Sequence, residues 1–276
     1  MVKSCRDHWQ ANLPAALDGR NPEGVHQVRV GLRRFRSALS LFRKFVPENQ
    51  RDWLNQEAKW LASQLGPVRD LDVFLADLDD RAEKGVDESV TALAAAVRKA
   101  HAKAKTAAVS ALRGARLRRF TARLETWLDG RGWYADDAEI PDVSTFAREV
   151  LNKRMRKIRE VAARADELTV PERHELRIAV KKLRYGLEFL FGVLPQKRAQ
   201  RTSGILKRLQ DSLGHLNDLD VAERTIAIAS AGATTAERRL IKKAGDALKA
   251  AHRKAAAKAE PETERLCSKL VKLPAF

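Results

Sequence analysis

The feature of this sequence that most restricts its fold is a long internal repeat. Residues 26–74 align with residues 174–222 at a constant offset of 148 and without a gap. Charged, apolar, Gly and Pro positions stay in register, and both copies end in Asp-Leu-Asp-Val. The matched positions include His26 on His174, Arg29 on Arg177, Lys59 on Lys207 and Leu65-Gly66 on Leu213-Gly214. Chance rarely preserves such a register, so the chain is predicted to contain two copies of one structural unit.

Composition and hydrophobic periodicity both predict an all-α fold. Gly and Pro account for only 14 and 9 of the 276 residues, and the abundant Ala, Leu, Arg and Lys residues favour helices. No stretch alternates polar and apolar residues convincingly, so little or no sheet is expected. Helices are expected over residues 5–17, 22–46, 51–65, 71–83, 87–113 and 117–129, and over 144–166, 170–194, 200–213, 219–231, 236–259 and 262–272.

Capping and breaking residues set the expected helix ends. Asn21 and Thr169 occupy equivalent positions and are good N-caps. Thr169 can also form a capping box with Glu172. Gly66 and Gly214 are expected to end the second helix of each copy, because glycine commonly terminates helices.

One segment, GRGWYADDAEIPDVS at 130–144, combines many turn residues and indicates a boundary. We therefore expect a first helical bundle over 1–133, a linker over 134–143 and a second bundle over 144–276.

The charge balance points to a polyanionic partner. Lys and Arg total 53 against 36 Asp and Glu, a net charge of +17, and such an excess opposes its own compaction. Nucleic acid, an anionic membrane surface and polyphosphate all satisfy this charge. No apolar run is long enough to span a membrane, and the N-terminus lacks the apolar region of a signal peptide. Only two cysteines are present, so no disulfide framework is expected. Together these features predict a cytoplasmic protein without membrane attachment.

A basic stripe runs along the helix that opens each copy. At 100° per residue, Arg29, Arg33 and Arg36 fall within about 80° of His26, and the stripe is about 15 Å long. Apolar residues border it on both sides, and most of its cations lack an acidic residue four positions away. A solvated helix face is the ordinary explanation of such a run, but these two features favour a groove for a linear anion. Arginine also matches phosphate oxygens in bidentate fashion.

The candidate ligands extend this stripe to both copies and to the following helix, whose lysine can line the same groove. They are His26, Arg29, Arg33, Arg36 and Lys59, and His174, Arg177, Lys181, Arg184 and Lys207. Weaker candidates are Arg34, Arg69, Lys182 and Arg208.

The histidines and aspartates of the repeat also allow structural interpretations. A lone histidine on a helix is usually structural, but His26 and His174 head matching stripes, which favours a ligand role. Neighbouring cations should lower the pKa of these histidines, and a bound polyanion should raise it. The aspartates at 70, 72, 218 and 220 resemble catalytic carboxylates, although capping a helix or holding an arginine is the favoured interpretation.

The segments VHQVRVGLRRFRSALSLFR, LGPVRDLDVF, HELRIAVKKLRYGLEFL and LGHLNDLDVA resemble the CHAD family, the "conserved histidine α-helical domain". The His-x-x-Arg-x-x-x-Arg/Lys motif occurs twice, each time followed by Leu-Gly-x-x-x-Asp-Leu-Asp. The resemblance implies two helical bundles related by a pseudo-twofold axis, with a basic central cavity or channel. It also implies inorganic polyphosphate as the ligand, the basic residues above as its binding site and, in some bacteria, placement at polyphosphate granules.

Family members are often fused to a triphosphate-tunnel (CYTH) enzyme with a Glu-x-Glu-x-Lys signature, and that signature does not occur in this sequence. A triphosphatase partner or granule proteins would therefore be separate chains. We expect no cofactor, no metal and no catalysis, because no metal-ligand cluster, Walker loop or nucleophile elbow is present. The alternatives are a nucleic-acid-binding protein, a phosphohydrolase accessory, or a structural protein of storage granules. If polyphosphate is the ligand, nucleic acid is expected only as a non-specific competitor.

Overall fold

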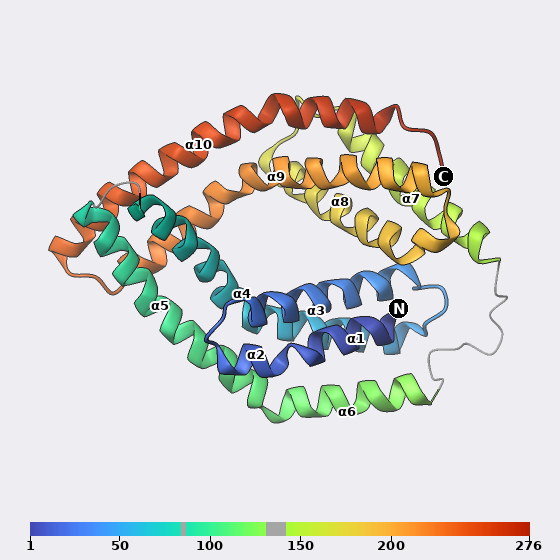
Figure 1. Cartoon of the computed structure of the whole chain (residues 1–276), viewed down its shortest axis with the longest axis horizontal. Helices are drawn as coiled ribbons and strands as arrows, with labels where there is room; N and C mark the ends of the chain where they lie inside the picture. The colour runs from blue at the N-terminus through green and yellow to red at the C-terminus, as the bar shows by residue number, and fades with distance from the viewer. Residues whose placement is uncertain (84–86, 131–141) are drawn as a thin grey trace. The chain divides into compact units, whose positions relative to one another are not determined.

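The computed structural model describes residues 1–83, 87–130 and 142–276, and all regular structure in this part of the chain is helical (Figure 1). For residues 83, 216 and 217 only the backbone is described. The all-α fold class is thereby confirmed. The linker expected over 134–143 falls, except for its last two residues, outside the described residues.

The helices group into two compact units. Unit 1 comprises Met1–Ala138 and Val221–Leu248, and unit 2 comprises Glu139–Asp220 and Lys249–Phe276. This division follows packing, whereas the boundary expected at residues 134–143 follows the repeat. The two-copy architecture and the central cavity therefore stay predictions.

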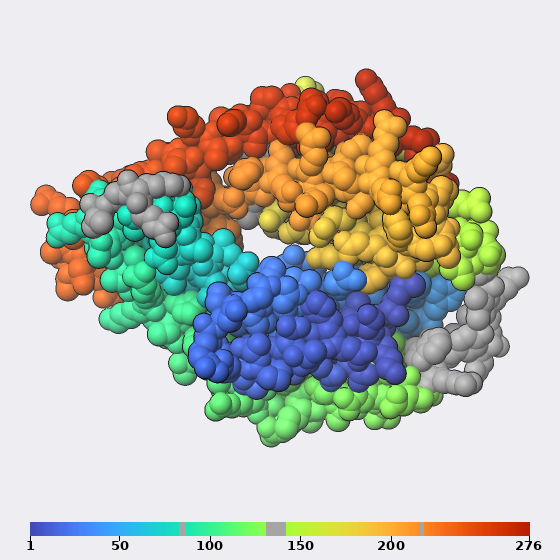
Figure 2. Space-filling view, viewed as in Figure 1, coloured from blue at the N-terminus to red at the C-terminus, as the bar shows by residue number. Residues whose placement is uncertain are grey.

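Two long helices that follow each other in the chain, α4 and α5, form the largest part of unit 1, and shorter helices flank them. Its helices are α1 (Val2–Ala11), α2 (Leu13–Asp18), α3 (Glu23–Leu41), α4 (Glu48–Glu83), α5 (Glu88–Arg113) and α6 (Ala115–Asp129), with the end of α9 (Gln196–Ser230) and the start of α10 (Thr235–Val271). In the face shown in Figure 2, the N-terminal helices of unit 1, in blue, lie beside α6, in green.

Aromatic rings join α1, α3, α4 and α6 in the core of unit 1. Trp9 stacks on Phe120 with ring centroids 5.9 Å apart and planes inclined by 4°. Phe35 and Trp53 meet the same Phe120 ring edge-on, at 6.5 and 5.8 Å. Phe35 belongs to the expected apolar face of α3, which is buried at every turn from Val28 to Leu39. The opposite face of α3 is therefore left to carry the basic stripe.

α4 is a single helix, so the helix end predicted at Gly66 and the separate helix predicted over 71–83 are wrong. Pro67 lies inside the helix. The reason is an unbroken apolar stripe, whose members recur every three or four residues. They are Leu54, Ala58, Leu61, Leu65, Val68, Leu71, Phe74 and Leu78, all buried. Glycine costs about 1 kcal/mol and proline about 3 kcal/mol inside a helix, whereas each buried large side chain contributes roughly 1.5–3 kcal/mol.

Two further predicted breaks are also wrong. α9 continues through Gly214, where the helices over 200–213 and 219–231 were expected to separate. α10 continues through Pro261, between the helices expected over 236–259 and 262–272. Conversely, the helix expected over 5–17 is divided at Asn12 into α1 and α2.

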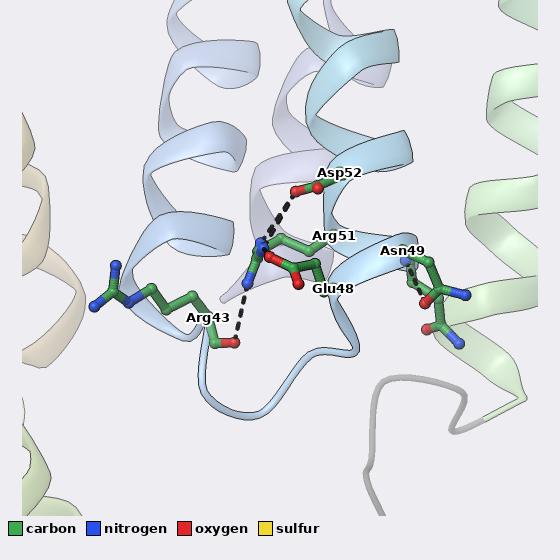
Figure 3. A network of polar contacts seen from close by, with 6 residues as sticks. Arg43, Glu48, Asn49, Arg51 and Asp52 are labelled. Carbon is green, nitrogen blue, oxygen red and sulfur yellow. Dashed lines mark hydrogen bonds and ion pairs between the residues drawn. The ribbon is translucent and has the colours of Figure 1, made fainter.

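α3 ends at Leu41, earlier than the predicted residue 46, and a turn leads from it to α4. Arg51, in the first turn of α4, pairs with Glu48 at 2.7 Å and with Asp52 at 3.3 Å (Figure 3). The same guanidinium donates a 3.5 Å hydrogen bond to the carbonyl of Arg43. These interactions fix the connecting segment against the start of α4.

Unit 2 contains α7 (Val143–Ala162), α8 (Val170–Leu190) and the 3-10 turn η1 (Phe191–Val193), with the first part of α9 and the last part of α10. The capping box between Thr169 and Glu172 at the start of α8 is confirmed. α9 is joined to α10 by a hydroxyl pair, Ser212 and Thr263, whose oxygens lie 2.6 Å apart. The expected apolar face of α8 is buried from Leu176 to Leu190.

Candidate anion-binding site

In unit 1 the basic stripe of α3 faces one side of α4. Because α4 is unbroken, Asn55, Lys59, Ala62, Gly66 and Arg69 recur at helical spacing and share one side of it. The two helices run antiparallel, so the end of the stripe meets the start of α4. This arrangement gives each stripe residue a specific neighbour on α4.

Arg29 is fixed to the backbone of α4. Its Nη1 donates a 2.6 Å hydrogen bond to the carbonyl oxygen of Ala62. Its Nε is buried and has no acceptor among the described residues. Burial lowers the pKa of the Arg29 guanidinium, with Asp70 opposing that effect. A largely dehydrated cation with a neutral carbonyl as its acceptor is a site where an anion gains stabilisation.

Arg36 lies near the other end of the stripe and also has a neutral partner. Its Nε donates to Asn55 Oδ1 at 2.9 Å, and burial lowers the pKa of its guanidinium. The hydrogen bond to Asn55 orients the side chain without neutralising its charge.

His26 lies among cations from both helices. Burial lowers the pKa of His26, and Arg69 on α4 lowers it further, as do Arg33 and Arg29. Glu23, one turn earlier on α3, opposes them. The direction agrees with the sequence-based expectation, although burial rather than charge is the largest cause. Arg69 is thus placed beside His26.

The remaining candidates of unit 1 have different surroundings. Lys59 is exposed on the α4 side that faces the stripe. Arg34, a weaker candidate, interacts with the thiol of Cys5 on α1, so it belongs to the packing of α1 rather than to the α3–α4 face. Arg69, only a weaker candidate by sequence, lies on the same side of α4 as Lys59, because the helix continues past Gly66.

The second stripe, on α8 in unit 2, differs in detail. His174 is exposed, whereas Arg177, Lys181 and Arg184 are partly buried. Arg184 pairs with Glu188 on its own helix at 3.6 Å and lies over the Tyr185 ring at 5.4 Å. This stripe therefore includes an arginine with an acidic neighbour four residues away.

Its expected apolar border is also open at Ile178, whose side chain is 40% exposed. On α9, Lys207 is exposed, whereas Arg208 pairs with Glu262 on α10. Lys182, also a weaker candidate, is exposed.

The aspartates of the repeat have structural roles in unit 1. Asp72 Oδ1 lies 2.7 Å from His101 Nε2 and joins α4 to α5. The negative charge of Asp70 raises the pKa of the Arg29 guanidinium, against the effect of burial. Within the described residues there is no group of three or more His, Cys, Asp or Glu side chains that could hold a metal ion. No helix in that part of the chain is long and apolar enough to cross a membrane.

The comparison with known families decides the classification. The family model of the CHAD domain matches residues 1–227. This chain belongs to the CHAD family. The two histidines of the CHAD motif lie on α3 and α8, each within the first turns of its helix.

Solved structures agree with the CHAD assignment. The crystal structure of the CHAD domain from the plant Ricinus communis matches with a TM-score of 0.82 and 29% identity, over 100% of this chain and 90% of that chain. PptA from Streptomyces chartreusis matches with a TM-score of 0.69 over 97% of this chain and 96% of that chain, and at 15% identity it shows a shared fold alone. No curated protein sequence matches this chain.

Proposed function

We propose that this CHAD domain binds inorganic polyphosphate through the basic stripes of α3 and α8 and through the lysines at 59 and 207 on the helices that follow. The observation that carries the proposal is the state of the arginines in unit 1. Arg29 and Arg36 are partly buried and oriented by neutral acceptors, a carbonyl and an amide oxygen. Asp70 offsets part of the Arg29 charge, and an anion that reaches the two guanidinium groups would supply the rest of the compensating charge.

The shape of the stripe supports a linear ligand rather than a single phosphate ion. His26 and Arg36 are ten residues apart on one helix, about 15 Å along its axis. Arginine forks at successive turns can each engage phosphate oxygens of one extended chain. The exposed Lys59 adds a further cation on the α4 side.

Nucleic acid is the main alternative, and the tryptophans argue against single-strand binding at this stripe. Stacking of bases requires accessible aromatic faces beside the cations. Trp9 is fully buried, and Trp53 and Trp60 carry Arg123 and Arg116 of α6 over their rings at 4.1 and 4.3 Å. Trp133 lies outside the described residues.

We propose a binding role rather than catalysis. The stripe offers mainly permanent cations, which bind phosphate but do not transfer protons. Placement at polyphosphate granules, and action beside a separate CYTH triphosphatase, are further proposals that rest on the resemblance to the CHAD family.

Charge reversal tests the proposal with a matched control. We expect Arg29→Glu combined with Arg177→Glu to weaken polyphosphate binding roughly 100-fold or more, because two charge-assisted hydrogen-bonding groups are removed. Lys254→Glu combined with Lys258→Glu removes the same charge from exposed positions of α10 and should change affinity by less than about threefold. Titration calorimetry measures both. Equal effects of the two double variants would indicate diffuse attraction and contradict the proposal.

Competition separates polyphosphate from nucleic acid. Long-chain polyphosphate should displace bound RNA or DNA at equal phosphate concentration and near-physiological salt, as followed by fluorescence anisotropy of labelled nucleic acid. Failure of polyphosphate to displace the nucleic acid would favour the nucleic-acid alternative.

A further inference from the structure

Gly66 occupies an unfavourable position for glycine, the interior of a long helix. Glycine there costs about as much helix stability as any residue except proline, and the helix does not end there. A Cβ atom at Gly66 would lie 3.1 Å from Arg29 Nη1 and 4.0 Å from Arg29 Cζ, and apart from its two chain neighbours and the adjacent backbone of α4 it would meet no other atom within 4 Å among the described residues. Outside α4 itself, the group that comes closest to the space left by the missing side chain is therefore the Arg29 guanidinium.

We infer that Gly66 is a positioning residue for polyphosphate binding, because its missing side chain lets Arg29 lie against α4 and donate to the Ala62 carbonyl. This inference rests on the proposed function. An approach of 3.1 Å to an added Cβ is tighter than ordinary packing, so the Arg29 guanidinium would have to shift by a few tenths of an ångström. The hydrogen bond between Arg29 Nη1 and Ala62, at 2.6 Å, would lengthen with it.

The benefit of this arrangement is preorganisation of a long, flexible side chain. A guanidinium carries five N–H donors, and one is used at Ala62. The Nε of Arg29 is buried, so phosphate binding falls to the remaining Nη donors. Because Arg29 is fixed before the ligand arrives, polyphosphate does not have to order it on binding.

The second copy provides a natural comparison. Gly214 is the repeat equivalent of Gly66, and apart from its chain neighbours and the adjacent backbone of α9 a Cβ there would meet no atom within 4 Å in the described part of the chain. Position 210, the equivalent of Ala62, carries a glutamine. The close approach of an arginine to a helical glycine is thus a property of the first copy.

Substitution of both glycines tests the inference. Gly66→Ala should weaken polyphosphate binding about fivefold, since one charge-assisted hydrogen bond to the ligand is weakened, while Gly214→Ala should leave affinity unchanged. Neither should lower the melting temperature, because alanine favours helix over glycine at both positions. In an Arg29→Ala background, Gly66→Ala should produce no further decrease in affinity, a coupling that a merely structural effect would not create.

The outcomes separate the inference from the function on which it rests. If Arg29→Ala itself leaves polyphosphate binding intact, the proposed function fails. Suppose instead that Arg29→Ala weakens polyphosphate binding. The positioning role is then overturned if Gly66→Ala leaves affinity unchanged, if Gly66→Ala and Gly214→Ala lower affinity equally, or if Gly66→Ala lowers affinity as much in the Arg29→Ala background as in the wild type. In each of these cases the proposed function stands.

Discussion

The individual residues of the first stripe differ in what they contribute. Arg29 and Arg36 are held by neutral acceptors on α4, whereas His26 is held in a low-pKa state by burial and by cations. The sequence was sufficient to place these residues on one helix face, because their helical spacing and their repetition are visible in it. It could not reveal Arg69 as a neighbour of His26, since that placement depends on α4 continuing past Gly66. Nor could it indicate that Arg208 is occupied by Glu262, which lies on another helix.

The lowered pKa of His26 predicts a pH-dependent affinity. In the empty site the pKa of His26 lies below its ordinary value because of burial and the positive charges of Arg69, Arg33 and Arg29, while Glu23 opposes them. A bound polyanion raises the pKa of His26. Binding therefore takes up a proton, and affinity increases as the pH falls through the interval between these two values. We expect polyphosphate to bind roughly three- to tenfold more tightly at pH 6 than at pH 8, at constant ionic strength.

His26→Gln should remove most of this pH response, measured by calorimetry at several pH values. His252→Gln, on α10, serves as the control and should retain it. A wild-type affinity that does not vary between pH 6 and pH 8 would exclude His26 as a ligand.

Among the helices, α4 shows why local signals mislead. The Leu-Gly-x-x-x-Asp-Leu-Asp segment has the composition of a helix end, and a break was therefore expected there. The buried side chains on both sides of Gly66 and Pro67 keep one register, so packing outweighs the two breakers. α10 likewise continues through Pro261, although no side chain from residue 249 to residue 262 is buried. The existence of the helices was predictable from periodicity, whereas their continuity depends on tertiary burial.

An uninterrupted α4 predicts an unusual effect of removing a proline. Pro67→Ala and Pro261→Ala should each stabilise the protein by about 1–3 kcal/mol, because proline inside a helix removes a hydrogen bond and clashes with the preceding turn. Pro47→Ala, just before α4, should instead be neutral or slightly destabilising, because proline there restricts the unfolded chain. Chemical denaturation measures all three. A decrease in stability of Pro67→Ala would contradict the continuity of α4.

For the whole molecule, the net charge of +17 can attract a polyanion in two ways, through cations at a specific binding site and through the general positive potential of the surface. The CHAD family was recognisable from the sequence motifs and is confirmed by the family match. The packing of residues 221–248 with unit 1 was not predictable, because the repeat alone suggests that each copy folds separately. The basic cavity shared by the two copies stays a prediction.

Salt dependence distinguishes the two contributions. Polyphosphate affinity should fall steeply with salt, because bound counterions are released from a polyanion when it binds. In the Arg29→Glu and Arg177→Glu double variant, the slope of log affinity against log salt should become shallower by about 0.7–0.9 for each phosphate that is no longer neutralised. An unchanged slope would place the phosphate-binding cations elsewhere on the surface.

Titration of the protein with orthophosphate, triphosphate and polyphosphates of increasing length, at near-physiological salt, tests the central claim most directly. If the cations spaced along a stripe bind one extended anion, affinity should rise steeply with chain length and level off only when the chain is long enough to engage the whole stripe. Triphosphate or orthophosphate binding as tightly as the long chains would contradict the account.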